Sequence, residues 1–265
     1  MLSRRRWMAR CLMLLPMLAA VVGSAQATAA QDWVERRNIG PFHIHSEFDL
    51  TPHARVFDDL ARIQRDLKRT LAVDRPRAPI TMFFLRDRQG YAQFLRENFS
   101  DVPERRAVYV QHKGQAFVIA YQSDQFATDL RHETTHALLH ADLPMVPLWL
   151  DEGLAEYFEL PANQRAFDNP HLTKTRWLAA LGLAPSMASL EGKGRLAEMG
   201  AAEYRYSWGW VHFMLHGPRA AHAELVAYLD DIRRRTPPGR LSERLARRLP
   251  DTDKRFVEHF RHWQR

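Results

Sequence analysis

The sequence predicts an α+β protein in which a small mixed sheet carrying helices precedes a mainly helical part. Two observations support this prediction. Up to about residue 122, alternating or apolar segments of strand length occur between helical segments. From Ser123 onward, apolar residues recur at the spacing of three and four positions that is typical of helices. The first part therefore reads as strand, helix, strand, helix and two further strands.

The segments before residue 122 can be placed individually. The first helix has Thr51 as N-cap and Pro52 as first helical residue. Gly114 lies in the turn of a hairpin. The predicted elements are a strand at 37–49, a helix from Thr51 to Leu71, a strand at 79–85, a helix at 88–99, and a hairpin at 107–121 whose strands are "AVYVQ" and "AFVIAY".

The remaining segments are predicted to be helices. Ser123 or Asp124 is the N-cap of the first, and Pro144 and Pro147 separate it from the second. The predicted helices are 123–140, 148–159, and those near 172–182, 203–216, 219–234 and 251–263. We expect four regions: a signal peptide at 1–30, an α/β lobe at 31–122, a helical lobe at 123–217, and C-terminal helices at 218–265, with a hinge at 233–240.

Residues 1–30 have the layout of a secretory signal peptide. Four arginines precede an apolar run at 11–22, and small residues lead to a cleavage site near Ala29 or Ala30. The run is short for a membrane span. The pattern predicts an exported protein, periplasmic or secreted, and an uncleaved N-terminal anchor is the alternative.

Composition limits the functions to consider. The chain has 38 basic and 31 acidic residues, a net charge of +7, and loss of the four arginines at 1–30 leaves +3. Such a small excess does not favour nucleic acid or a membrane surface as partner. Cys11, the single cysteine, lies in the signal segment. The mature chain thus has no thiolate, and any metal must be held by His, Asp or Glu.

The segment "RHETTHALLH" at 131–140 contains two histidines at helical spacing. His132 and His136 are four residues apart, so one helix face presents both imidazoles to a single ion. Catalytic zinc usually has three protein ligands and one open position, so a third ligand is needed. Glu152 and Glu156, also four apart, lie on the next predicted helix and can approach the histidines from the opposite side.

"HETTH" followed after fifteen residues by "EGLAEYFE" resembles the gluzincin zinc peptidases. "WLDEGLAEYF" is similar to the "WLNEGFA" segment of the aminopeptidase N branch, and closer still to exported bacterial peptidase-MA-like proteins. The resemblance covers about residues 80–216 and rests mainly on 131–159. It implies a zincin-like fold and one bound zinc ion.

The resemblance also implies roles. His132, His136 and Glu152 would be zinc ligands, and Glu133 the general base that takes a proton from zinc-bound water. Glu156 would support a zinc-bound histidine. Counting residues as in thermolysin-like gluzincins would instead make Glu156 the third ligand, and this alternative stays open.

Other residues receive provisional roles. By the same resemblance, Tyr204, three before Ser207, would stabilise the oxyanion, with Tyr206 or an aromatic core stripe as alternatives. "AFVIAY" would line the cleft and pair with substrate, unless it is an ordinary buried strand.

We expect His140 to be a polar residue at the helix end, where a positively charged imidazolium interacts favourably with the helix dipole. Asp151 and Glu159 are expected to be solvated.

These inferences favour an exported zinc metallopeptidase. Its substrate would be a peptide or protein, with cell-wall peptide included, and the aminopeptidase segment that recognises a free N-terminus is not evident. One alternative is a zinc-binding envelope protein with a binding or assembly role and no proteolysis. Another is a helical interaction protein in which "HETTH" arose by chance, but this alternative also requires that the paired acids Glu152 and Glu156 arose by chance.

Overall fold

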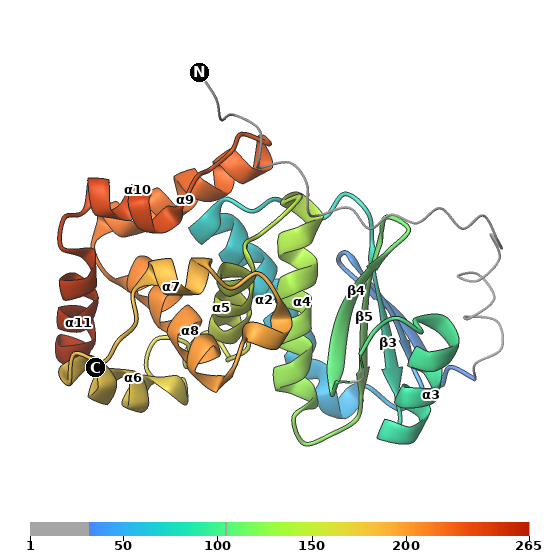
Figure 1. Ribbon diagram of the computed structural model, residues 1–265. Coiled ribbons are helices and arrows are strands. Elements are labelled where there is room, and N and C mark those ends of the chain that lie inside the picture. The colour runs from blue at the N-terminus through green and yellow to red at the C-terminus, as the bar shows by residue number, and fades with distance from the viewer. Residues whose placement is uncertain (1–31, 104, 265) are drawn as a thin grey trace. The chain divides into compact units, whose positions relative to one another are not determined.

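Five strands form one mixed sheet in the first part of the chain (Figure 1). The computed structural model describes residues 32–103 and 105–264, so the predicted signal peptide lies outside the described residues. The order across the sheet is β1-β2-β3-β5-β4. The strands are β1 (Glu35–Ile39), β2 (Phe42–Ser46), β3 (Ile80–Leu85), β4 (Ala107–His112) and β5 (Gln115–Tyr121).

Two antiparallel hairpins flank a parallel centre. The segment expected to be one strand at 37–49 folds as two, β1 and β2, because the chain reverses at Gly40 with φ of +56°. The predicted hairpin of β4 and β5 is confirmed, and Lys113 and Gly114 both have positive φ, as a two-residue turn requires. Strands β2, β3 and β5 run parallel to one another.

The two faces of the sheet are buried by different helices. Along β3, Ile80, Met82 and Phe84 join the larger core, whereas Phe83 and Leu85 join a smaller cluster on the other face. Helices α2 and α4 contribute to the larger core, and α3 covers the smaller cluster (Figure 1). Helix α4 therefore lies directly against the sheet, in contact with β4 and β5.

The rest of the described chain is helical, which confirms the α+β class. Helix α4 packs on the sheet and on α5, and α5 packs in turn on α8. The helices are α2 (Ala54–Leu71), α3 (Arg88–Asn98), α4 (Phe126–Asp142), α5 (Leu148–Phe158), α6 (His171–Ala180), α7 (Met187–Glu191), α8 (Ala201–His216), α9 (Arg219–Arg233), α10 (Leu241–Arg248) and α11 (Thr252–His262).

Some predicted boundaries were wrong. A 3-10 turn occupies Thr51–His53, so Thr51 does not cap the α-helix that starts at Ala54. Helix α4 begins at Phe126, after Gln125, rather than at Ser123 or Asp124. Helices α7 and α10 were not predicted, because both are short and follow loops rich in Gly and Pro. In the part of the chain that the structure describes, no helix combines the length and apolar composition of a bilayer crossing.

Candidate functional site

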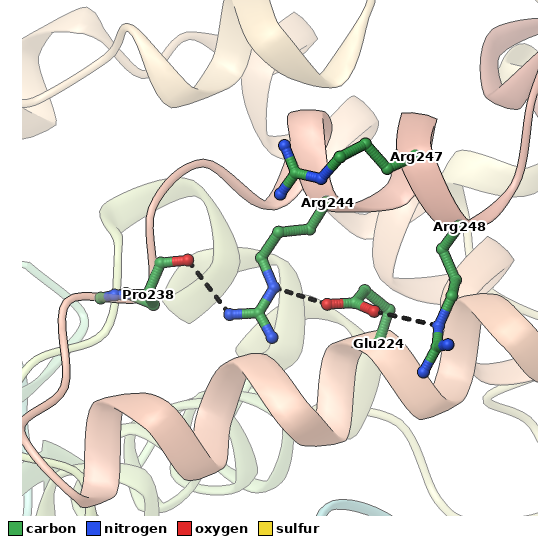
Figure 2. A pocket seen from close by; sticks show the side chains of 5 residues that line it. All are labelled: Glu224, Pro238, Arg244, Arg247 and Arg248. Carbon is green, nitrogen blue, oxygen red and sulfur yellow. Dashed lines mark hydrogen bonds and ion pairs between the residues drawn. The ribbon is translucent and has the colours of Figure 1, made fainter.

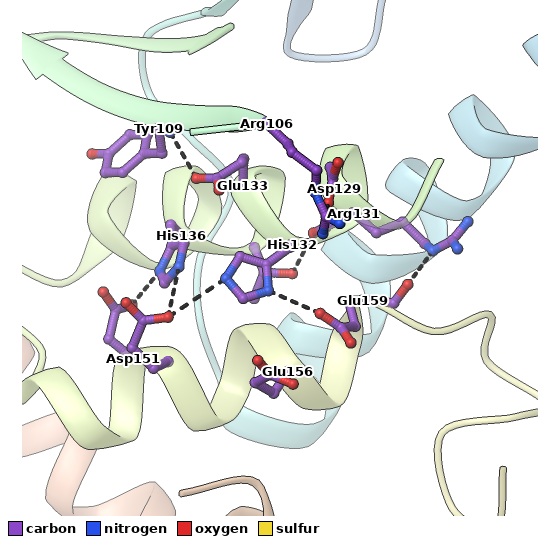
Figure 3. A network of polar contacts seen from close by, with 12 residues as sticks. Arg106, Tyr109, Asp129, Arg131, His132, Glu133, His136, Asp151, Glu156 and Glu159 are labelled. Atoms are coloured by element: carbon purple, nitrogen blue, oxygen red, sulfur yellow. Dashed lines mark hydrogen bonds and ion pairs between the residues drawn. The ribbon is translucent and has the colours of Figure 1, made fainter. Parts of the chain in front are cut away.

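Helix α4 presents the two predicted histidine ligands on the face that meets α5. His132 and His136 are one turn apart, and their ring centroids are 5.0 Å from each other. Both side chains are largely buried between the two helices (Figure 3). The Pro-containing connection allows α5 to fold back on α4, as the sequence predicted. The two imidazoles therefore face a common partner element.

Glu152 of α5 lies opposite both imidazoles. Its Oε2 atom is 3.5 Å from Nε2 of His132 and 3.7 Å from Nε2 of His136. Two donors that share a tetrahedral zinc ion at 2.0–2.2 Å would be about 3.3–3.5 Å apart. One nitrogen from each histidine and one carboxylate oxygen thus converge at separations that fit a single small ion, and these three residues could hold a metal.

A close approach of two helices holds Glu152 in place. A Cβ atom on the adjacent Gly153 would lie 2.6 Å from the carbonyl oxygen of Ser207 in α8, which is closer than real atoms come. Glycine is therefore required for α5 to pack this tightly on α8. The tight packing leaves Glu152 5 % exposed and directed at α4.

The remaining ring nitrogens of the two histidines meet carboxylates from α5 and its end. His132 Nδ1 is hydrogen-bonded to Glu159 Oε2 at 3.0 Å, and His136 Nδ1 lies 3.0 Å from Asp151 Oδ1. The expectation that Asp151 and Glu159 are solvated was wrong, since each carboxylate side chain is only 14 % exposed. With each Nδ1 directed at a carboxylate, both Nε2 atoms are left to face Glu152.

Arg131 anchors the segment that carries Glu159. Its guanidinium donates to the backbone carbonyl of Glu159 (Figure 3). It also pairs with Asp59 of α2 at 3.1 Å. The arginine is itself buried, at 6 % exposure. Because the buried Arg131 side chain is held by two interactions, it restricts where the Glu159 carboxylate can lie.

Glu156 has a different neighbour from the one we expected. Its Oε2 atom lies 3.0 Å from Nε2 of His171, at the start of α6. It also falls in a group with His132 and Glu159 that could hold a metal, so it remains close to the site. Glu152 approaches both predicted histidine ligands, whereas Glu156 is grouped with His132 alone. The contact with a predicted histidine ligand that we assigned to Glu156 is made by Glu159 instead.

The carboxylates determine how the two histidines are charged. Burial alone would lower the pKa of His132, but the carboxylates of Glu152 and Glu159 outweigh it and raise the pKa well above its ordinary value. Burial likewise opposes protonation of His136, and Asp151 reverses the effect and raises its pKa. An environment that stabilises two imidazolium ions would also stabilise a bound cation.

Glu133 points from α4 toward the sheet rather than toward α5. Its Oε2 atom accepts a hydrogen bond from the backbone N–H of Tyr109 in β4 at 2.7 Å (Figure 3). The expectation that "AFVIAY" pairs with substrate was wrong, because β5 lies between β3 and β4 and both of its edges are occupied. The edge strands are β1 and β4, and β4 is the one beside α4 and Glu133, so β4 is the strand that another chain could join at this site.

A pocket of about 360 Å³ opens beside these side chains. Tyr204 lines it, and burial, followed by the charge of Glu152, raises the pKa of its hydroxyl. Tyr206 does not line it, since its hydroxyl donates to the carbonyl of Leu183 at 3.2 Å. The lining residues are Arg105, Arg106, Ala107, Gln125, Thr128, Asp129, His132, Glu133, Glu152, Glu156, Glu159 and Tyr204.

A larger pocket of about 420 Å³ lies between α9 and α10 (Figure 2). Three arginines surround Glu224, and Arg244 and Arg248 pair with its carboxylate, the latter at 3.4 Å. Arg244 also donates to the carbonyl of Pro238 at 3.1 Å. These ion pairs join two helices and offer no nucleophile or metal ligand beyond the paired carboxylate. The side chains that could hold a metal line the smaller pocket instead.

Comparison with known proteins gives little further information. No protein-family model and no curated protein matches the sequence. Among solved structures, the chain is similar to an M1 zinc metallopeptidase from Deinococcus radiodurans, with 15 % identity and a TM-score of 0.47. The match covers 86 % of this chain and 50 % of that one, so the chain spans about half the length of the peptidase. No family membership follows from this similarity.

Proposed function

We propose that this chain is an exported zinc-dependent peptidase with a gluzincin-like site. The observation that carries the proposal is the convergence of His132, His136 and Glu152 beside Glu133 and a free strand edge. In the proposed site the first three residues hold the ion. A zinc ion bound there would act as a Lewis acid and lower the pKa of a coordinated water toward about 7.

Glu133 is the proposed general base. The Tyr109 N–H holds one oxygen of its carboxylate, and the second oxygen can accept the proton of the attacking water. The same carboxylate then passes that proton to the amine nitrogen as the C–N bond breaks. A base is needed for hydrolysis and not for a purely structural metal site, so its place beside the pocket favours catalysis over simple binding.

Strand β4 and Tyr204 would position the substrate and stabilise charge. A peptide that adds to the free edge of β4 would run past Glu133, with backbone hydrogen bonds holding it extended. Tyr204, across the pocket, would donate its hydroxyl proton in a hydrogen bond to the developing oxyanion. The raised pKa of Tyr204 keeps that proton in place at neutral pH.

Metal analysis with peptide cleavage tests the proposal. The purified protein should contain about one zinc per chain, and His132→Ala should lose it. Wild type should cleave members of a mixed fluorogenic peptide library, and a chelator should abolish cleavage. Zinc binding without cleavage of any peptide would support the non-proteolytic envelope role, and absence of zinc would reject both.

The third ligand can be assigned in the same assay. Glu152→Ala should weaken zinc binding more than Glu156→Ala, because Glu152 faces both imidazoles and Glu156 pairs with His171. The reverse ranking would make Glu156 the ligand. Export is tested separately, by fractionating cells that express the full chain and measuring the N-terminal mass of the product.

A further inference from the structure

Asp151 contacts two histidines of α4 at once. Its Oδ2 atom is hydrogen-bonded to Nε2 of His140 at 3.0 Å, and its Oδ1 atom lies 3.0 Å from Nδ1 of His136. The Oδ1 and Nδ1 atoms are buried and neither has a hydrogen-bond partner within the described residues, so their 3.0 Å approach is an ion-pair contact and not a formed hydrogen bond. Because an unpaired buried polar atom is costly, a hydrogen bond completed between these two neighbouring atoms would satisfy both.

His140 is held in turn by the edge strand. The ring of Tyr109 stacks on that of His140 with centroids 5.6 Å apart and an interplanar angle of 10°. Tyr109 also lies 6.5 Å from the His136 ring and holds Glu133 through its backbone N–H. His140, which we expected only to favour the helix dipole, therefore lies in a chain of contacts from β4 to a predicted ligand.

We propose that His140 and Asp151 form a positioning pair that fixes the orientation of His136 for metal binding. The inference rests on the proposed function. His140 donates its Nε2 proton to one oxygen of Asp151, and the second oxygen accepts the Nδ1 proton of His136. His136 is thereby held in the tautomer whose Nε2 lone pair faces the ion. The carboxylate is required because an amide has only one oxygen with which to accept.

The two predicted ligands differ in this respect. His132 relies on Glu159, whose position is set by Arg131. His136 relies on Asp151, whose position is set by His140. His140 thus acts on the ion only through another side chain, so it is a positioning residue rather than a ligand.

The chain supplies a matched control in His171. His171 also pairs with an α5 carboxylate at 3.0 Å, and its side chain is 22 % exposed against 21 % for His140. Its partner Glu156 is not a ligand in the proposed site. The two histidines are therefore equal in burial and in type of contact, and they differ in whether the carboxylate reaches His136.

The experiment measures zinc affinity by competition with a chelator. We expect His140→Ala and Asp151→Asn each to weaken binding by about 10–100-fold. His171→Ala should change affinity less than about threefold by the same principle, since no ligand depends on it. His140→Gln retains an N–H donor and should recover part of the affinity. In cobalt-substituted protein, the visible absorption spectrum should shift in His140→Ala and not in His171→Ala.

Each contrary result has a distinct meaning. Unchanged affinity and spectrum in His140→Ala and Asp151→Asn, with zinc still bound, would overturn the positioning pair and leave the proposed function intact. A larger loss of zinc affinity in His171→Ala than in His140→Ala would overturn the positioning pair, because it would indicate that Glu156 is the ligand. Two ions per chain in wild type, one of them lost in His140→Ala, would mean that His136, His140 and Asp151 form a second metal site. Wild type without zinc would reject the proposed function and the inference together.

Discussion

Two histidine clusters share the same four-residue spacing on a helix and differ in the chemistry of the groups that surround them. One lies on α4, where His132 and His136 are four residues apart. The other lies on α8, where His212 and His216 are also four apart, and it includes His259 of α11. In the first cluster the partners are carboxylates, whereas in the second they are aromatic rings and neutral polar atoms.

The second cluster is saturated by neutral partners. His212 Nε2 lies 3.0 Å from the carbonyl oxygen of Ala166, and its Nδ1 lies 3.0 Å from Nε2 of His259. His216 Nε2 meets the hydroxyl of Tyr157 at 2.7 Å. The rings of Trp208, Phe260 and Trp263 surround the cluster. No face with a converging carboxylate remains for an ion within the described residues.

The pKa values of the two clusters move in opposite directions. Carboxylates raise those of His132 and His136 against the effect of burial. Burial lowers the pKa of His212 well below its ordinary value, and lowers those of His216 and His259 to about 4. In this molecule, paired histidines on a helix are held in surroundings that favour a positive charge only where acids from another element face them.

The largest effect is expected for Glu133, the proposed general base beside the first cluster. Glu133→Gln should lower kcat by roughly 10²–10⁴-fold, because it removes the proton acceptor and keeps the ligands. Zinc content and Tm should stay close to wild type. His259→Gln is the corresponding change in the second cluster and should lower Tm while kcat and zinc remain. Activity of Glu133→Gln within a few-fold of wild type would exclude Glu133 as base.

The next effect concerns the oxyanion. Tyr204→Phe should lower kcat by about 10²–10³-fold with little change in KM or zinc content, because the ring is kept and the hydroxyl is lost. Tyr206→Phe is the control on the same helix, and its hydroxyl only meets the carbonyl of Leu183. Small, equal effects would leave the oxyanion donor unidentified, and a large effect at Tyr206 alone would move the assignment by two residues.

A third effect is the dependence of stability on pH that the second cluster should cause. His216 and His259 have pKa values of about 4 when folded and about 6.5 when unfolded. Between these values the unfolded chain binds more protons, so stability is full above about pH 6.5 and falls as pH drops toward 4. Protonation of each group should lower the free energy of unfolding by about 3 kcal/mol. Urea unfolding from pH 7 to 4 should show a shallower decline for His216→Gln than for wild type, and equal declines would contradict the assignment.

The smallest effect tests the carboxylate behind His132. Glu159→Gln should weaken zinc binding by about 10–100-fold, since it removes the charge that holds His132 Nδ1. Glu156→Gln serves as the comparison, because its carboxylate meets His171 instead. A greater loss at Glu156 would show that the roles of the two acids are exchanged.

The local parts of the candidate site could be predicted from spacing. A helical repeat places His132 and His136 on one face wherever α4 packs, and the short connection predicted that an acid of the next helix, Glu152 or Glu156, would approach them. Asp151 and Glu159 were missed because the rotation of α5 about its axis decides which acids point at α4. That rotation depends on the packing of Gly153 against α8, which no local pattern records.

The sheet was predicted in the same partial way. The hairpin of β4 and β5 follows from its turn residues, but the identity of the edge strand does not. The continuous apolar run "AFVIAY" was a usable sign, because a strand buried on both faces belongs inside the sheet. The more polar end of β4 is consistent with its place at the edge.

The sequence alone determined the α+β class, the pairing of two histidines on one helix face and the presence of acids on the next helix, because helical period and turn chemistry are local properties. Only the tertiary structure decided which nitrogen meets which carboxylate, which strand keeps a free edge, and why the spacing His212–His216 yields a neutral core instead of a cation site. These outcomes depend on contacts between elements far apart in the chain. Burial and neighbouring charge there set the electrostatic free energy of each histidine, and neither quantity is a property of a sequence window.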